Sequence, residues 1–235
     1  MQRITLEEFE EIATAQPFNN ILLEKDYFVT LILFLLKDFQ DLYFKGGTAL
    51  NKIFLNHARL SEDIDLTITT DVNTIKEKIE KVLLDSLFFT KVTHDKHVDR
   101  FMRIIVHYQG FYGNEGNIFI DLNQKASLHL TPEKHTVHHF YESYIPQFSF
   151  PTLAQKEMFA EKMRATIERN KPRDHFDLYQ IITRGLPLDL ELVQKKCEES
   201  KCEFNIVRMF NKANRLKQKW DEDIEPLLTK KITFQ

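Results

Sequence analysis

A glycine pair followed by two aspartates one residue apart most constrains what this chain can fold into. The pair, Gly46-Gly47, has no Cβ atoms, so its backbone can adopt conformations that other residues resist and can approach a ligand closely. Thr48 then offers a hydroxyl at the start of a predicted helix, whose apolar residues have the i, i+3, i+4 spacing of an amphipathic face. Free N–H groups at such a helix start favour an anion. The segment therefore predicts a phosphate-binding turn.

The two aspartates belong to a strictly alternating segment, Asp63-Ile64-Asp65-Leu66-Thr67-Ile68. In a β-strand this alternation places the apolar residues on one face and both carboxylates on the other. Side by side the two carboxylates would repel each other, and a divalent cation bound between them and a triphosphate would neutralise the pair. The pattern therefore predicts a Mg²⁺ site that includes Asp63 and Asp65.

A third acid of the same kind, Asp121, lies in the alternating segment 117–122. Three strand-borne carboxylates allow a two-metal site, with metals about 3.5–4 Å apart that hold the attacking and leaving oxygens. Asp121 would then bridge the catalytic metal or orient the nucleophile as a base. A lone aspartate on a strand is also a common way to keep a sheet edge soluble, so this alternative stays open.

Together these segments resemble the nucleotidyltransferase superfamily, whose signature is a Gly-Gly or Gly-Ser turn followed by Asp-x-Asp. The sequences of residues 45–48 and 61–66 resemble those of the AbiEii-type abortive-infection toxin nucleotidyltransferases still more closely. Three further segments resemble motifs of that family: Glu24-Lys25-Asp26-Tyr27, Lys162 through Arg169, and Arg173-Asp174-His175-Phe176-Asp177-Leu178. The resemblance covers about residues 20 to 180.

The residue pattern and the resemblance together give a set of candidate site residues. The expected catalytic residues are Asp63, Asp65, Asp121, Lys162 and Asp174, of which the first three would hold the metal. The expected nucleotide-binding residues are Lys45, Gly46, Gly47, Thr48, Ser61, Arg169 and Arg173. The cofactor implied is Mg²⁺, with a nucleoside triphosphate (NTP) as substrate.

The resemblance implies a toxin of a bacterial toxin–antitoxin or phage-defence pair. Such an enzyme would transfer a nucleoside monophosphate from an NTP to an RNA acceptor, with the tRNA 3′ end favoured, and so stop translation. Its implied partner is a cognate antitoxin with a winged-helix DNA-binding region. Two alternatives remain: transfer to a small molecule or a protein hydroxyl, and a nucleotide-binding regulatory module with little turnover. Intact Asp63, Asp65 and Lys162 argue against an inactive site.

Apolar patterning excludes a membrane protein. No run approaches the eighteen or so consecutive apolar residues of a membrane span, and the N-terminus lacks a secretory hydrophobic segment, so we expect a cytoplasmic protein. Cys197 and Cys202 are too few and wrongly spaced for a thiolate zinc site, and a disulfide is not expected in that compartment.

The periodicity predicts an α+β fold. Helices are expected over residues 20–38 and 72–86, and strands over 87–93, 101–109 and 117–124, with the last two joined as a hairpin by the glycine-containing turn 110–116. After Pro146 and Pro151 the pattern is helical to near residue 220. We therefore predict a nucleotidyltransferase core with a mixed sheet over residues 1–150, and a helical C-terminal region over 151–235 that completes the active site.

The helical region offers cations to the predicted site. Lys162 and Arg169 lie seven residues apart, two turns along one face of a helix, and we expect Lys162 to contact NTP phosphates rather than a structural carboxylate. For Arg173, Asp174 and Asp177, the alternative is a structural ion-pair network with a helix N-cap.

Charge is distributed unevenly along the chain. Residues 1–150 carry 15 Lys and Arg against 21 Asp and Glu, whereas residues 151–235 carry 17 against 14. A continuous C-terminal helix would gather Arg208, Lys212, Arg215 and Lys219 into one basic stripe, which predicts an RNA docking surface there. A solvated face paired with local acids is the alternative. The cluster His135, His138 and His139 is interpreted as surface histidines rather than a metal site.

Overall fold

The computed structural model describes residues 3–98, 100–124, 127–211 and 213–234. Within these ranges a mixed β-sheet has the strand order β3-β4-β5-β2-β1-β7-β6. The strands are β1 (Leu42–Lys45), β2 (Ile64–Ile68), β3 (Lys91–Val98), β4 (Phe101–Gln109), β5 (Glu115–Asn123), β6 (Glu133–Val137) and β7 (Phe148–Thr152). Strand β2 pairs in parallel with β5 and antiparallel with β1, and β1 pairs in parallel with β7. The predicted α+β class with a mixed sheet is confirmed.

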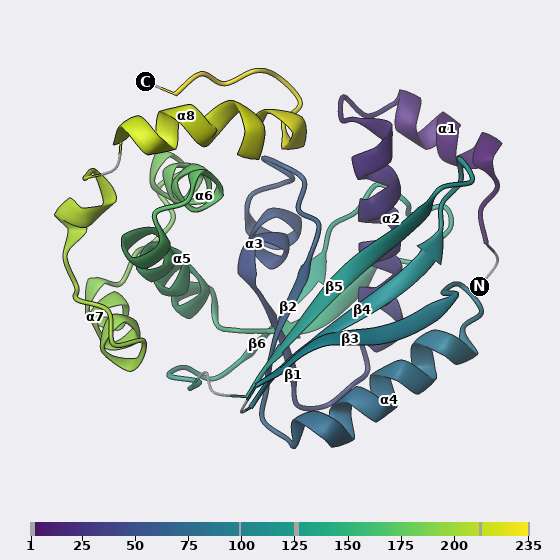
Figure 1. Ribbon diagram of the computed structural model, residues 1–235, viewed down its shortest axis with the longest axis horizontal. Helices are drawn as coiled ribbons and strands as arrows, with labels where there is room; N and C mark the ends of the chain where they lie inside the picture. Colours follow the sequence, from purple (N-terminus) through teal and green to yellow (C-terminus); the bar gives the residue numbers. More distant parts are fainter. Residues whose placement is uncertain (1–2, 99, 125–126, 212, 235) are drawn as a thin grey trace.

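Two groups of helices flank this sheet (Figure 1). The first group is α1 (Leu6–Thr14), α2 (Asn20–Leu36) and α4 (Val72–Asp85). The second group is α3 (Gly46–Ala49), α5 (Gln155–Arg169), α6 (Pro172–Thr183), α7 (Leu190–Glu199) and α8 (Ala213–Asp223). Local sequence fixes several helix ends, because Asn19 and Asp71 accept hydrogen bonds from the first free N–H groups of α2 and α4. Asn170 ends α5 in a left-handed conformation.

Strand alternation gives the sheet one apolar face. Ile64, Leu66 and Ile68 of β2 are buried, as predicted, and they join one hydrophobic core with β5 and the α2 and α4 helices. The opposite face carries polar side chains at the ends of β1, β2 and β5, and α5 lies across from it. The fold therefore leaves one face of the central strands free for chemistry.

Several predicted elements are confirmed and others are wrong. The predicted helices at 20–38 and 72–86 and the β4–β5 hairpin are present. Strand β3 begins at Lys91 rather than 87, since Leu87 has a positive φ. The predicted helix after the glycine pair is only α3 followed by a π-helical turn, η1 (Leu50–Phe54). Strand β2 begins one residue later than predicted, so Asp63 precedes it.

The start of the helical half also differs from the prediction. The segment after Pro146 first forms β7, which pairs with β1, and helix begins only at Gln155. Residue 150, the predicted boundary between core and helical region, therefore lies inside a strand of the sheet. The division into two domains stays a prediction.

The predicted continuous basic helix is wrong. Arg208 lies in a short 3₁₀ turn, η2 (Ile206–Met209), and α8 begins only at Ala213, so Arg208 does not share a helix with Arg215 and Lys219. Lys212 lies outside the described residues. Val207 and Phe210, on either side of Arg208 and Met209, are largely exposed.

Among the described residues, no helix is both long enough and apolar enough to cross a membrane.

Candidate active site

The glycine turn lies where β1 ends and α3 begins, and both glycines are required there. Gly46 has φ +75°, and a Cβ on it would lie 2.0 Å from Oδ2 of Asp65. A Cβ on Gly47 would lie 2.7 Å from Nη2 of Arg59. Any larger residue would therefore collide with the aspartate or with the arginine behind the turn. The turn and Asp65 form one closely fitted unit.

Two of the three predicted strand-borne acids, Asp65 and Asp121, lie side by side on the central strands β2 and β5. Asp65 of β2 is the register partner of Lys45 on β1 and of Asp121 on β5. Asp121 in turn accepts two hydrogen bonds from Arg103 of β4, each 2.7 Å long. Arg103 was missed in the sequence because its cross-strand position follows from β4–β5 register alone. The Asp121 carboxylate is therefore paired with the Arg103 guanidinium within the site.

Burial raises the proton affinity of two of these acids, Asp65 and Asp63. Burial raises the pKa of Asp65 to about 6; Lys45 opposes this rise, and Asp121 and Asp63 add to it. Burial also raises the pKa of Asp63, with Lys25 opposing the change and Glu62 adding to it. An additional positive charge at this position would relieve both effects.

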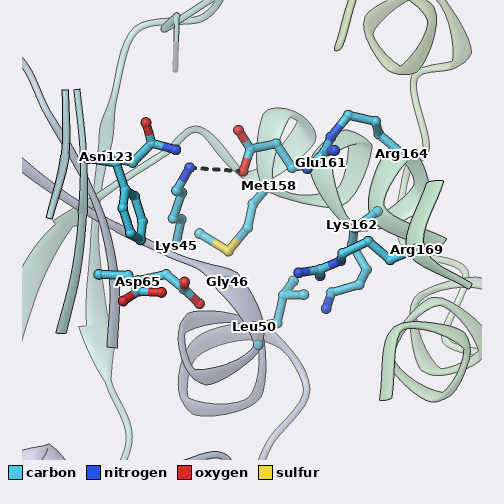
Figure 2. A pocket seen from close by; sticks show the side chains of 14 residues that line it. Lys45, Gly46, Leu50, Asp65, Asn123, Met158, Glu161, Lys162, Arg164 and Arg169 are labelled. Atoms are coloured by element: carbon cyan, nitrogen blue, oxygen red, sulfur yellow. Dashed lines mark ion pairs between the residues drawn. The ribbon is translucent and has the colours of Figure 1, made fainter. Parts of the chain in front are cut away.

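A pocket of about 270 Å³ opens between these strands and α5. Seven of the predicted site residues line it: Lys45, Gly46, Gly47, Asp65, Asp121, Lys162 and Arg169. Figure 2 shows Lys45 and Asp65 on the sheet side and Glu161, Lys162 and Arg169 on the helix side. The shared face predicted for Lys162 and Arg169 on a helix is confirmed, and α5 brings both to the pocket.

Lys162 lies in a buried charge network at the pocket wall. Its Nζ is 2.9 Å from Oδ1 of Asp174 and 3.0 Å from Oδ2 of Asp177. Although burial opposes its charged form, Asp177 and Asp174 hold the pKa of Lys162 above its usual value. The expectation that Lys162 avoids structural carboxylates is therefore wrong, whereas its contact with NTP phosphates stays a prediction.

The same network reaches the glycine turn through Arg59. Arg59 donates two hydrogen bonds to Asp177, 2.8 and 2.7 Å long, and both side chains are buried. Asn51 donates to the Gly47 carbonyl at 3.0 Å and to Asp177 at 3.3 Å. The ion-pair alternative for Asp177 thus agrees with the structure, whereas the N-cap of α6 is Lys171. Sequence reasoning missed Arg59 and Asn51, because neither has a periodicity or motif that marks it.

The other predicted site residues lie outside the pocket lining, and Asp63 is one of them, so its expected metal contact stays a prediction. Thr48 donates a 2.8 Å hydrogen bond to Ser61 and another to the Asp63 carbonyl. These bonds stabilise the loop before β2. Arg173 donates to Glu62 and to the Asp223 carbonyl.

Asp174 also lies behind the pocket wall. It binds Lys162 and Arg169 through Oδ1, and its buried Oδ2 has no hydrogen-bond partner among the described residues. The catalytic or binding roles expected for Thr48, Ser61, Arg173 and Asp174 stay predictions.

The predicted histidine cluster is not one uniform surface group. His135 contacts Glu133 at 2.7 Å, whereas His139 is buried, and burial lowers its pKa to about 4. Across the described part of the chain, no three His, Cys, Asp or Glu side chains gather closely enough to hold a metal ion by themselves.

The donor set nonetheless fits Mg²⁺ in one particular way. Mg²⁺ is usually held by one or two carboxylates plus substrate phosphates, not by a cage of protein ligands. Asp63 and Asp65 are hard oxygen donors with raised pKa values, and a glycine turn for phosphate adjoins Asp65. These two carboxylates would hold the ion together with a bound triphosphate. Asp121 is already paired with Arg103, and its expected metal contact stays a prediction.

Comparison with known proteins identifies the family. A family model described as nucleotidyl transferase AbiEii toxin, type IV toxin–antitoxin system, matches residues 32–234. The chain belongs to this AbiEii family. It is thus a nucleotidyltransferase toxin of the type IV toxin–antitoxin class, and the family implies an antitoxin partner. No curated protein matches the sequence at a significant level.

Solved structures share its fold. JHP933 from Helicobacter pylori superposes with a TM-score of 0.62 at 17% identity, covering 92% of this chain and 87% of that protein. MenT4, a nucleotidyltransferase toxin from Mycobacterium tuberculosis H37Rv, gives a TM-score of 0.58 at 20% identity, covering 82% and 68%. At these identities the likeness supports the nucleotidyltransferase fold alone.

Proposed function

We propose that this AbiEii-family toxin transfers a nucleoside monophosphate from an NTP to an RNA, favouring the tRNA 3′ end, in a Mg²⁺-dependent reaction. The observation that carries the proposal is the close fit of the Gly46 turn against Asp65, with the cations of α5 across the same pocket. A phosphate-binding turn, a carboxylate and facing cations are what an NTP requires.

The proposed reaction breaks one bond and forms one. An acceptor hydroxyl oxygen attacks the α-phosphorus, the bond from that phosphorus to the β-phosphate oxygen breaks, and pyrophosphate leaves with its electron pair. The hydroxyl proton passes to solvent. Mg²⁺, when bound, would neutralise charge on the transferring phosphate.

The chain's own residues bind and orient the nucleotide in this proposal. Backbone N–H groups at the glycine turn and the cations Lys162 and Arg169 would hold the phosphates. Asp63 and Asp65 would supply carboxylate oxygens for the ion. Asp121, held by Arg103, would keep its side chain in place beside Asp65.

The test is incubation of purified protein with each α-labelled NTP and total RNA, with Asp65→Ala as the control. Label on RNA that requires Mg²⁺ and Asp65 supports the proposal, and digestion of the labelled RNA locates the acceptor end. Label on protein or on a small molecule would support the alternative acceptors. Nucleotide binding without any transfer would favour a regulatory module.

The toxin role has its own test. We propose that expression stops translation as part of phage defence, and that the neighbouring antitoxin carries a winged-helix DNA-binding region. Co-expression of the adjacent gene product should restore growth in cells that produce the wild-type chain. Growth arrest that persists with Asp65→Ala would contradict nucleotidyl transfer as its cause.

A further inference from the structure

The lysines and arginines that line the pocket all have carboxylate partners among the described residues. Three of these cations have partners outside the pocket lining: Lys162 with Asp174 and Asp177, Arg169 with Asp174, and Arg164 with Glu168. Lys45 differs, because its partner Glu161, 3.6 Å away, lines the pocket as well. Within the described part of the chain, Lys45 is thus the one pocket cation that shares the pocket with its carboxylate.

Glu161 is held in this position from behind by a second lysine. Lys196 of α7 donates to Oε1 of Glu161 at 3.4 Å, whereas Lys45 faces Oε2. Lys196 is itself buried, 2.5 Å from Oε1 of Glu157 and 2.8 Å from the Ser127 carbonyl. The Glu161 carboxylate therefore cannot turn out of the pocket without losing its contact with Lys196.

Glu161 carries its negative charge in this setting. Although burial favours its neutral form, Lys45, Lys196 and Arg164 hold the pKa of Glu161 below its usual range. An ionised carboxylate attracts an ammonium as a phosphate does. Glu161 can therefore compete with a bound phosphate for a cation.

Lys45 is the cation for which this competition arises. It ends β1 and directly precedes Gly46 of the predicted phosphate turn, and Figure 2 shows its side chain reaching across the pocket to Glu161. A phosphate at the turn would offer the same ammonium a second anion. Because a lysine carries a compact charge on a flexible stem, Lys45 can exchange one anion for the other.

We propose that Glu161 competes with the nucleotide phosphates for Lys45 and so limits how tightly the pocket binds them. Glu161 holds the ammonium in the free protein, a triphosphate takes it over on binding, and Glu161 takes it back as pyrophosphate leaves. This inference rests on the proposed function in taking a triphosphate as the ligand. Such competition favours turnover, because release of product limits the rate of many enzymes. Loss of the Glu161 charge should therefore strengthen phosphate binding, whereas loss of a residue that only supports the pocket wall would weaken it.

The test measures the Kd of inorganic tripolyphosphate and of pyrophosphate by calorimetry in Mg²⁺ buffer without RNA. Glu161→Gln should bind both about fivefold more tightly than wild type, which is the upper range for a partly screened ion pair. Lys45→Met should weaken binding. The double variant should bind no more tightly than Lys45→Met alone, because the ammonium for which the anions compete is gone.

Glu80→Gln is the matched control. Glu80 lies 3.6 Å from Lys76 on α4, on the other side of the sheet, so this variant removes a carboxylate from a Lys–Glu pair of the same length. Both Kd values should stay those of wild type.

Two results would overturn the inference. Unchanged or weaker binding by folded Glu161→Gln would show that the residue only supports the wall. An equal gain with and without Lys45 would show simple repulsion rather than exchange of the ammonium. If Glu161→Gln does not fold, Glu161→Asp serves instead: it keeps the charge but draws the carboxylate back from Lys45 by about 1.5 Å. Binding should again tighten, and unchanged Kd values would overturn the inference.

The outcomes also separate this inference from the proposed function. Wild-type protein that transfers no nucleotide to RNA, together with a gain in Glu161→Gln that requires Lys45, would refute the transfer and keep the competition. Wild-type protein that transfers nucleotide, together with no gain in Glu161→Gln, would keep the transfer and refute the competition.

Discussion

The surroundings of Asp65 disfavour its negative charge. It is only partly exposed, it packs against Gly46, and it shares its face of the sheet with Asp121. Lys45 offsets this cost only in part, since the pKa remains raised to about 6. A carboxylate in such a position costs stability when ionised, and a bound cation would remove that cost.

This cost predicts a pH dependence of stability in metal-free buffer. Between about pH 4, the pKa of an unfolded aspartate, and about pH 6, the folded protein binds more protons than the unfolded chain. Asp65 therefore lowers the free energy of unfolding as pH rises through this window, by about 1–2 kcal/mol for a partly exposed group. Urea denaturation should show a flatter profile for Asp65→Asn than for wild type. Mg²⁺ at pH 7 should raise the wild-type melting temperature and not that of the variant, and parallel pH profiles would contradict the assignment.

Transfer should depend on the same carboxylate. Asp65→Ala removes a proposed Mg²⁺ ligand, and a loss of about 4 kcal/mol of transition-state stabilisation lowers the rate about a thousandfold. Asp63→Ala should have a similar effect while the circular dichroism spectrum stays that of wild type. Single-turnover transfer from a labelled NTP measures both. A folded Asp65→Ala protein that retains most of its activity would refute the role.

At the scale of elements, buried ion pairs join the glycine turn to the helical half. Arg59, in the loop after η1, binds Asp177 of α6, and Asp177 binds Lys162 of α5. A buried pair of this kind gives little net stability, but loss of one partner leaves an uncompensated charge. The network therefore fixes how α5 and α6 sit against the turn.

Removal of Arg59 should accordingly be costly. Arg59→Ala leaves Asp177 buried with less compensation, and we expect a loss of about 3 kcal/mol in the free energy of unfolding. Arg59→Lys should recover only part of this, because an ammonium cannot reproduce the two parallel hydrogen bonds. Lys81→Ala, which breaks an exposed pair with Asp85 on α4, is the control and should leave urea denaturation unchanged. Equal midpoints for Arg59→Ala and wild type would contradict the proposed constraint.

Sequence periodicity could reveal the long elements but not the short ones. Helices α2 and α4 and the β4–β5 hairpin have enough repeats to be predicted. Strands β1, β6 and β7 span four or five residues each, and β7 contains Pro151. Unlike the equally short β2, they have no acidic motif with strict alternation to distinguish them from a loop. Local motifs likewise led to Asp65 and Gly46. Arg59 and Arg103 were not predicted, because only tertiary structure brings them to Asp177 and Asp121, respectively.

At the scale of the whole molecule, the site lies where the sheet meets the C-terminal helices, and the proposed RNA acceptor would approach that junction. The C-terminal part carries the excess of Lys and Arg. Helix α8 buries Leu216 and Trp220 and leaves Arg215 and Lys219 exposed. Since Arg208 belongs to η2, these cations form a discontinuous basic surface rather than the single helical stripe that the sequence predicts.

This surface gives the last prediction, which concerns RNA docking. Replacement of Arg208, Arg215 and Lys219 by glutamine should weaken RNA binding and make its salt dependence shallower, by about 0.7 in slope for each single-strand phosphate that is no longer neutralised. The matched control replaces three lysines of α4, Lys76, Lys78 and Lys81, which lie on the other side of the sheet (Figure 1). Binding measured across a salt series should change for the first variant and not for the second. Equal affinities and slopes for both variants and wild type would exclude η2 and α8 as the docking surface, and the acceptor would then have to reach the pocket past β4 and β5, where Phe101 and Asn123 line it.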